Sequence, residues 1–159
     1  MLLITQAAAV VFLAAWLTTG VLENVLYPEL NRVFTAEVLD MARMRKEYPD
    51  AYALVAHRRV SNPSVQTWLF KLIVAWEIFA TLVLWAGSAA LILAVFGRVE
   101  AASARSLALL GTLSFTSVWV GFLVAGNWFC YWYCHEGAQS THFQMTLWGM
   151  ATLILIAVG

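Results

Sequence analysis

Four long stretches of apolar residues dominate the pattern of this chain. The first runs from Leu2 to Leu22 without a charged residue, and the second, from Leu72 to Gly97, holds a single charge at Glu77. A third stretch without formal charge covers residues 106–135, and the last runs from Thr141 to Gly159. About 20 helical residues cross the hydrocarbon core of a membrane. The pattern therefore predicts four transmembrane helices, at about residues 2–22, 64–97, 105–134 and 140–159.

Short signals indicate where these helices begin and how they pack. Asn62 followed by Pro63 is typical of a helix start, with Asn as the N-cap and Pro in the first turn. Residues 136–139 form a short polar hairpin, after which Ser140 or Thr141 can cap the last helix. Small residues at spacings of three and four let membrane helices approach closely. In the third span they are Gly111, Ser114, Ser117 and Gly121.

The segment between the first two spans, residues 28–63, has a different character. It contains six basic and five acidic residues. Phe34, Val38, Met41 and Arg45 fall on one face at helical spacing, which is an amphipathic pattern. Pro49 interrupts it, and Asp50 can cap a short second helix over residues 51–57. We interpret the segment as helical pieces at the bilayer interface or against a partner, with a solvated extramembrane loop as the alternative.

Composition agrees with a membrane protein. Hydrophobic residues make up 62% of the chain and charged residues 11%, whereas a soluble domain is nearer half apolar and a quarter charged. The formal net charge of zero gives no basic field for nucleic acid. The first basic residue is Arg32, so a signal peptide is not indicated. We expect one all-α domain over residues 1–159, a four-helix transmembrane bundle with an amphipathic helical loop between spans one and two.

The distribution of basic residues predicts the orientation. Arg98 and Arg105 flank the turn between the second and third spans, whereas the hairpin between the third and fourth has no Lys or Arg. Basic residues favour the cytoplasmic side of a membrane. The difference in basic residues between these two connections therefore predicts that both termini lie on the cytoplasmic side of a bacterial inner membrane. The six basic residues of the first loop argue for the opposite orientation.

Cysteine and histidine residues gather around the predicted hairpin. Cys130 and Cys134 would lie one turn apart on one helix face, a spacing that strains a disulfide. His135 follows directly, and His142 lies across the hairpin, with Met145 one turn further. Two thiolates, an imidazole and a thioether would suit copper(I) or zinc. The alternative is that both cysteines are small buried hydrophobic residues without a ligand.

Other cofactors and catalytic sites are not indicated. Membrane haems are held by histidines of facing helices, and no predicted span has a histidine near its centre, so we expect no haem. The chain lacks the G-x-S-x-G, H-E-x-x-H, P-loop and G-x-G-x-x-G motifs. We therefore expect a chain that is not itself an enzyme.

Glu77 is the one acidic residue well inside a predicted span. An intramembrane carboxyl group is costly and is normally paired or functional. Asn127, at a similar depth on the third span, is the predicted hydrogen-bond partner. Glu77 can tie helices together, or it can handle protons or ions.

Aromatic residues are concentrated at the end of the third span. Trp128, Phe129, Tyr131 and Trp132 lie within five positions, and Trp68 lies on the same side of the membrane. Tryptophan and tyrosine favour the membrane interface, so an ordinary aromatic belt is one interpretation. The other is a contact surface for a protein partner, a phospholipid or a quinone.

Three of these features resemble a family of bacterial proteins described as predicted small integral membrane proteins. They are the Asn62-Pro63 entry with Val74-Ala75-Trp76-Glu77, the segment Gly126-Asn127-Trp128-Phe129 with Trp132, and the hairpin Glu136-Gly137-Ala138-Gln139 before a last apolar helix. The resemblance implies a four-helix topology without implying an activity.

Three functions remain open from the sequence. The leading hypothesis is a non-catalytic accessory subunit of a larger inner-membrane complex, respiratory or otherwise energy-converting, with other integral membrane subunits as partners. The second is a metal- or quinone-handling redox subunit that uses Cys130, Cys134, His135 and His142. The third is a small transporter or channel that uses Glu77.

Overall fold

The computed structural model describes residues 1–158 as an all-α protein, and no strand occurs in this range. The prediction of an all-α fold is confirmed. Its long helices are α1 (Leu2–Leu26), α5 (Pro63–Val95), α6 (Ala101–Trp128) and α7 (Glu136–Ala157). The shorter elements are α2 (Pro28–Leu39), α3 (Ala42–Glu47), α4 (Pro49–Val55) and the 3₁₀ turns η1 (Ala56–Arg58) and η2 (Tyr131–Tyr133).

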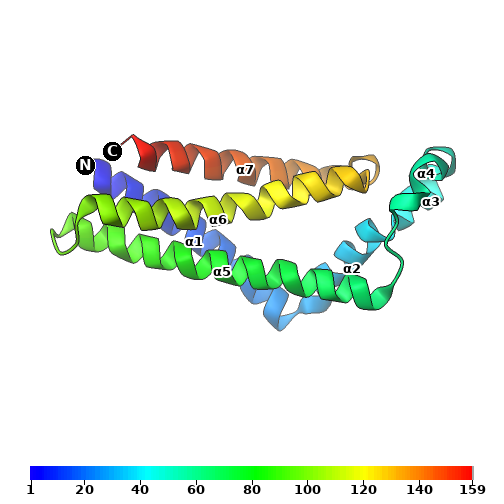
Figure 1. Cartoon of the computed structure of the whole chain (residues 1–159), viewed down its shortest axis with the longest axis horizontal. Helices are drawn as coiled ribbons and strands as arrows, with labels where there is room; N and C mark the ends of the chain where they lie inside the picture. The colour runs from blue at the N-terminus through cyan, green and yellow to red at the C-terminus, as the bar shows by residue number, and fades with distance from the viewer. Residues whose placement is uncertain (159) are drawn as a thin grey trace.

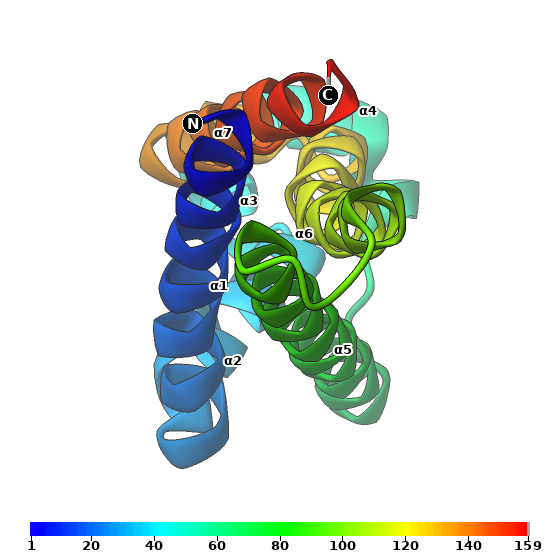
Figure 2. The ribbon, with the colours of Figure 1, turned by 90° about the vertical axis from the view of Figure 1, so that its left-hand side faces the viewer.

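The two ends of the bundle differ in what they carry (Figure 1). The N- and C-termini lie at one end together with the turn between α5 and α6, as predicted for four antiparallel passes. The opposite end carries α3, α4 and the connection between α6 and α7. Figure 2, seen from the end with the termini, shows α1 leaning away from α7 toward its own C-terminus.

Helices α1, α5 and α6 are long and apolar enough to cross a membrane. Helix α7 has 22 residues and packs along α6, but it is not among the helices that meet this criterion within the described residues. The fourth crossing therefore stays a prediction.

The backbones of α5 and α6 touch at two glycines. A Cβ atom added to Gly87 would lie 2.7 Å from the Cα atom of Ala108, and one added to Gly111 would lie 2.9 Å from the Cα atom of Leu84. Gly111 therefore serves packing inside this chain. Gly121, from the same predicted row of small residues, has no neighbouring atom within 4 Å of such a Cβ.

Polar side chains tie the helices together near the termini. Gln6 is fully buried, and its Nε2 donates to the carbonyl oxygen of Leu155 at 2.9 Å. Its Oε1 accepts a hydrogen bond from Nε of Arg105 at 3.1 Å. One glutamine thus joins α1, α6 and α7. The indole N–H of Trp85 donates to the hydroxyl of Thr18 at 2.9 Å and adds a link between α1 and α5.

The helix starts match the sequence signals only in part. Asn62 caps α5 as predicted, because its Oδ1 accepts from the backbone N–H of Ser64 at 2.9 Å. Helix α7 begins at Glu136 with His135 as its N-cap, so the capping role predicted for Ser140 or Thr141 is wrong. The predicted hairpin, residues 136–139, is instead the first turn of α7.

Helix α6 ends earlier than the apolar pattern indicates. Its last residue is Trp128, six positions before the predicted end at residue 134. Cys130 has a φ of 53°, in the left-handed region that an α-helix cannot contain. The aromatic segment after Trp128 is therefore the connection between α6 and α7, with the turn η2 at its centre.

The first loop is helical, as predicted, but its interruptions differ. Met41 has a φ of 50° and separates α2 from α3. Tyr48 is the N-cap of α4 and Pro49 its first residue, so the predicted capping role of Asp50 is wrong. Asp50 lies in the first turn instead, where an acidic side chain favours the helix dipole.

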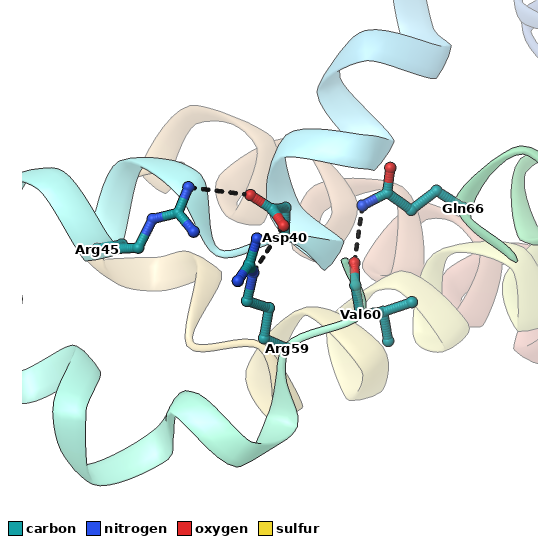
Figure 3. A network of polar contacts seen from close by, with 5 residues as sticks. All are labelled: Asp40, Arg45, Arg59, Val60 and Gln66. Carbon is teal, nitrogen blue, oxygen red and sulfur yellow. Dashed lines mark hydrogen bonds and ion pairs between the residues drawn. The ribbon is translucent and has the colours of Figure 1, made fainter. Parts of the chain in front are cut away.

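Polar contacts close the loop at its base (Figure 3). The carboxylate of Asp40, at the end of α2, pairs with Arg45 at 3.3 Å and with Arg59 at 2.7 Å. The carbonyl oxygen of Val60 accepts from Nε2 of Gln66 on α5 at 2.7 Å. These contacts hold the segment that contains α3, α4 and η1 against the start of α5.

The close approach at Gly111 predicts that alanine substitutions at two glycines of α6 change stability by different amounts. Gly111→Ala should lower the free energy of unfolding by about 1–3 kcal/mol, because the new methyl group must separate the backbones of α5 and α6. Gly121→Ala is the control and should change stability by less than about 1 kcal/mol, since alanine favours a helix and the site is open. Unfolding in mixed detergent micelles, followed by circular dichroism, measures both. Equal stability of the two variants would contradict the close contact between α5 and α6 at Gly111.

Candidate functional site

The aromatic segment between α6 and α7 packs on the first loop at the end of the bundle opposite the termini. Met41, Met44 and Cys130 are buried together at the centre of this contact. Partly buried side chains surround them: Ala51, Tyr52, Val55, Phe129, Tyr133 and Cys134. We call this contact the junction. It joins two parts of the chain that are about 90 residues apart in sequence.

Two tryptophans of the segment stay exposed although their neighbours are buried. Trp128 is 54% exposed and Trp132 is 46% exposed. The guanidinium of Arg58 lies 4.6 Å from the centre of the Trp128 ring and donates to the Trp128 carbonyl oxygen at 3.2 Å. The Trp132 ring stacks on Tyr133 with 4.2 Å between centres. Both indoles are thus held in place by this chain while one side of each remains open.

The other aromatic residues predicted to contact a partner fall into different environments. Phe129 and Tyr131 contribute to internal packing. A Cβ atom on Gly126 would lie 2.7 Å from the Tyr131 ring, so this glycine lets the ring fold back against α6. Trp68 is exposed on the second turn of α5, in a hollow that it shares with Pro63, Ser64, Thr67 and Lys71. Of the residues predicted to form a contact surface, only the tryptophans are therefore exposed.

The two cysteines lie at opposite ends of η2. Cys130 precedes this turn and Cys134 follows it, so the prediction that they share one face of a helix is wrong. Neither forms a disulfide. Both line a cavity of about 10 Å³, close to the space that one water molecule fills. The same cavity is lined by Val38, Met41, Met44, Phe129, Tyr131 and His135.

Electrostatics at the junction favour the neutral forms of two groups. Burial raises the pKa of the Cys134 thiol, and the negative charge of Glu47 adds to this effect. Burial also lowers the pKa of His135, so its imidazole is neutral at pH 7. Next to Cys130, a nitrogen of Arg58 lies 3.8 Å from the sulfur. Arg43 pairs with Glu37 and donates to the carbonyl oxygen of Cys134 at 3.5 Å.

His142 lies apart from the cysteines. Its ring stacks on Phe122 with 4.7 Å between centres and on Tyr131 with 6.0 Å, and it is absent from the lining of the cavity. Within the described part of the chain, its Nδ1 has no hydrogen-bond partner. No group of three His, Cys, Asp or Glu side chains there is placed to hold a metal ion. The predicted set of Cys130, Cys134, His135 and His142 is therefore divided, and metal binding stays a prediction.

Glu77 faces protein, as predicted, and is only 5% exposed. Its partner is Asn24 on α1, whose Nδ2 donates to Oε2 of Glu77 at 2.7 Å. The prediction of Asn127 as the partner is wrong, because that residue is exposed on α6. Asn24 in turn accepts from Asn31 at 2.8 Å, and Asn31 donates to Glu23 at 3.2 Å. A chain of hydrogen bonds thus connects the buried carboxyl group to an exposed one.

Sequence patterns could not identify Asn24 or the two methionines as site residues. Asn24 lies at the polar end of the first apolar stretch, where a solvated residue is the ordinary interpretation. Met41 and Met44 line the cavity from the point where the backbone reverses, because Met41 is the left-handed N-cap of α3. Periodicity assumes a continuous helix, so it cannot anticipate this reversal.

Comparison with known proteins identifies the family. The family described as "Predicted small integral membrane protein (DUF2165)" matches residues 2–159. The chain belongs to this family, in agreement with the resemblance in its sequence. No curated protein and no solved structure matches it.

The hydrogen bond between Asn24 and Glu77 predicts that substitutions of Asn24 and Asn127 change stability by different amounts. Asn24→Leu should lower the free energy of unfolding by about 1–3 kcal/mol, because it leaves the buried carboxyl group without its donor. Asn127→Leu is the matched control and should have little effect, since that side chain is exposed. Unfolding in mixed micelles measures both variants. A larger loss of stability for Asn127→Leu than for Asn24→Leu would favour Asn127 of α6 as the partner of Glu77.

Proposed function

We propose that this small integral membrane protein is a non-catalytic accessory subunit of a larger bacterial inner-membrane complex, in a respiratory or other energy-converting assembly. Its partners are other integral membrane chains. The observation that carries the proposal is the pair of half-exposed indoles, Trp128 and Trp132, fixed by their own chain at the junction.

Pre-organisation is the physical reason to favour a protein contact at this pair. Ordering a flexible side chain at an interface costs about 0.5–1.5 kcal/mol. Trp128 already lies under Arg58, and Trp132 already lies on Tyr133. Tryptophan is also enriched among the residues that dominate interface affinity. A partner that binds this pair therefore meets rings whose positions are already set.

Helix α2 offers a second apolar surface. Leu30, Val33 and Phe34 are large apolar residues that remain exposed on this helix. Their spacing of three and four places them on one helical face. Lipid can cover this face, or a neighbouring subunit can. The proposal assigns it to a neighbouring subunit of the same complex.

The orientation proposed for the complex has both termini in the cytoplasm and the junction on the other side of the membrane. Arg98 and Arg105, at the end with the termini, support it through the preference of basic residues for the cytoplasm. A fluorescent protein fused after residue 159 that requires the cytoplasm to mature should fluoresce. A fusion that is stably inserted but not fluorescent would show the opposite orientation, with both termini outside the cytoplasm.

The proposal predicts that the two indoles are needed for assembly. Changing Trp128 and Trp132 together to Ala should remove the co-purifying membrane subunits while the protein still inserts and folds, because the rings contribute contact area outside the bundle core. Purification in a mild detergent, followed by mass spectrometry of the co-purifying chains, measures the loss.

The control replaces exposed apolar residues away from the junction. Phe12 on α1 and Leu82 on α5 are 60% and 65% exposed. Phe12→Ala with Leu82→Ala should leave the complex intact. The accessory role at this surface is refuted when the same partners co-purify with both double variants, or when no specific membrane chain accompanies the unmodified protein.

A further inference from the structure

We infer that the junction is a binding site for one copper(I) ion, with the sulfur atoms of Met41, Met44, Cys130 and Cys134 as its ligands. The inference does not rest on the accessory role, because it concerns the interior of the junction and not its exposed indoles. It also differs from the ligand set expected from the sequence, since two thioethers take the place of the histidines.

The first argument is that four sulfur-bearing residues line one cavity. The chain has two cysteines and five methionines. Both cysteines and two of the methionines line a single cavity of about 10 Å³. Met41, Met44 and Cys130 are buried, whereas Cys134 and His135 are half-buried. The space suits a single atom and is too small for an organic ligand.

The second argument is the backbone. Among the described residues, Met41 and Cys130 are the two non-glycine residues with positive φ, at 50° and 53°. Both line this cavity, from opposite sides of the junction. Such conformations are unfavourable for residues with a side chain and gather at sites where function requires them. Each reversal ends a helix and directs a sulfur-bearing residue inward.

The ligand type selects the metal. Thiolates and thioethers together are soft donors, which suit copper(I). Structural zinc is held by four cysteine, histidine or carboxylate ligands, and the described residues provide no such group of three. Binding involves no electron transfer: copper enters as copper(I), and each cysteine that ligates it loses its thiol proton to solvent.

A positive charge lies beside one of the two thiolate ligands, Cys130. Copper(I) with two thiolates carries a net charge of −1, and it needs a compensating cation in a partly buried place. A guanidinium nitrogen of Arg58 lies 3.8 Å from the sulfur of Cys130. Arg58 thus supplies a positive charge on the outer side of one ligand, where it does not enter the cavity lining.

Titration of the whole protein with copper(I) tests the inference. The reduced chain in detergent micelles, kept free of oxygen, should remove one equivalent of copper(I) from its coloured bicinchoninate complex. X-ray absorption of the loaded protein should show a first shell made of sulfur. Zinc added at the same concentration should not displace the copper.

Variants separate the four ligands from other sulfur atoms. Met41→Leu with Met44→Leu keeps the shape of the wall and removes its thioethers, and it should weaken copper(I) binding at least tenfold. Met145→Leu is the matched control and should leave affinity unchanged, because Met145 packs against the core of the bundle. Cys130→Ala with Cys134→Ala should abolish the stoichiometric binding, while circular dichroism shows that the helices remain.

Several outcomes would overturn the site. They are a failure to compete with bicinchoninate, binding that survives removal of both cysteines, and equal losses for the Met41/Met44 pair and for Met145. If the cysteine variant does not fold, the methionine variants still decide the question. A shell of nitrogen and oxygen atoms in the absorption spectrum would assign any bound copper to another place.

Discussion

The close approach of α5 and α6 is the constraint on which the rest of the structure depends. At Gly87 and Gly111 the backbones come so near that a Cβ atom would collide with the facing helix. Lipid is as apolar as a leucine side chain, so membrane helices associate through close packing and polar contacts. This pair forms the axis on which α1 and α7 pack, with Gln6 joining α1, α6 and α7 near the termini.

At the other end of the bundle, the shape is set by where helices stop. The left-handed residue Cys130 follows the end of α6 and begins the turn that carries Trp132, while Trp128 is the last residue of α6. The left-handed residue Met41 ends α2 and turns α3 under that segment. The ion pairs of Asp40 with Arg45 and Arg59 then close the loop (Figure 3). Two reversals and one carboxylate thus produce the junction from segments far apart in sequence.

Much of the fold could be predicted because it rests on local properties: long uncharged stretches, the Asn62 cap and the amphipathic first loop. The failures share one cause, which is tertiary contact. Cys130 and Cys134 were expected on one helix face because the apolar stretch continues past Trp128, but the Tyr131 ring folds back over Gly126 and the helix has already ended. Asn24 was missed as the partner of Glu77 because pairing between helices leaves no trace in periodicity.

The same few residues set both the interior and the exterior of the junction, and this connects the two proposals. Arg58 approaches the sulfur of Cys130 while its guanidinium lies over the outer indole, Trp128. A ligand bound inside the junction would stabilise its folded form by mass action, and Arg58 of the first loop is the residue that also holds Trp128. By thermodynamic linkage, a partner that prefers the fixed Trp128 ring would strengthen metal binding by the same factor by which the metal strengthens partner binding. Copper(I) inside and a membrane subunit outside would therefore meet at one residue, Arg58.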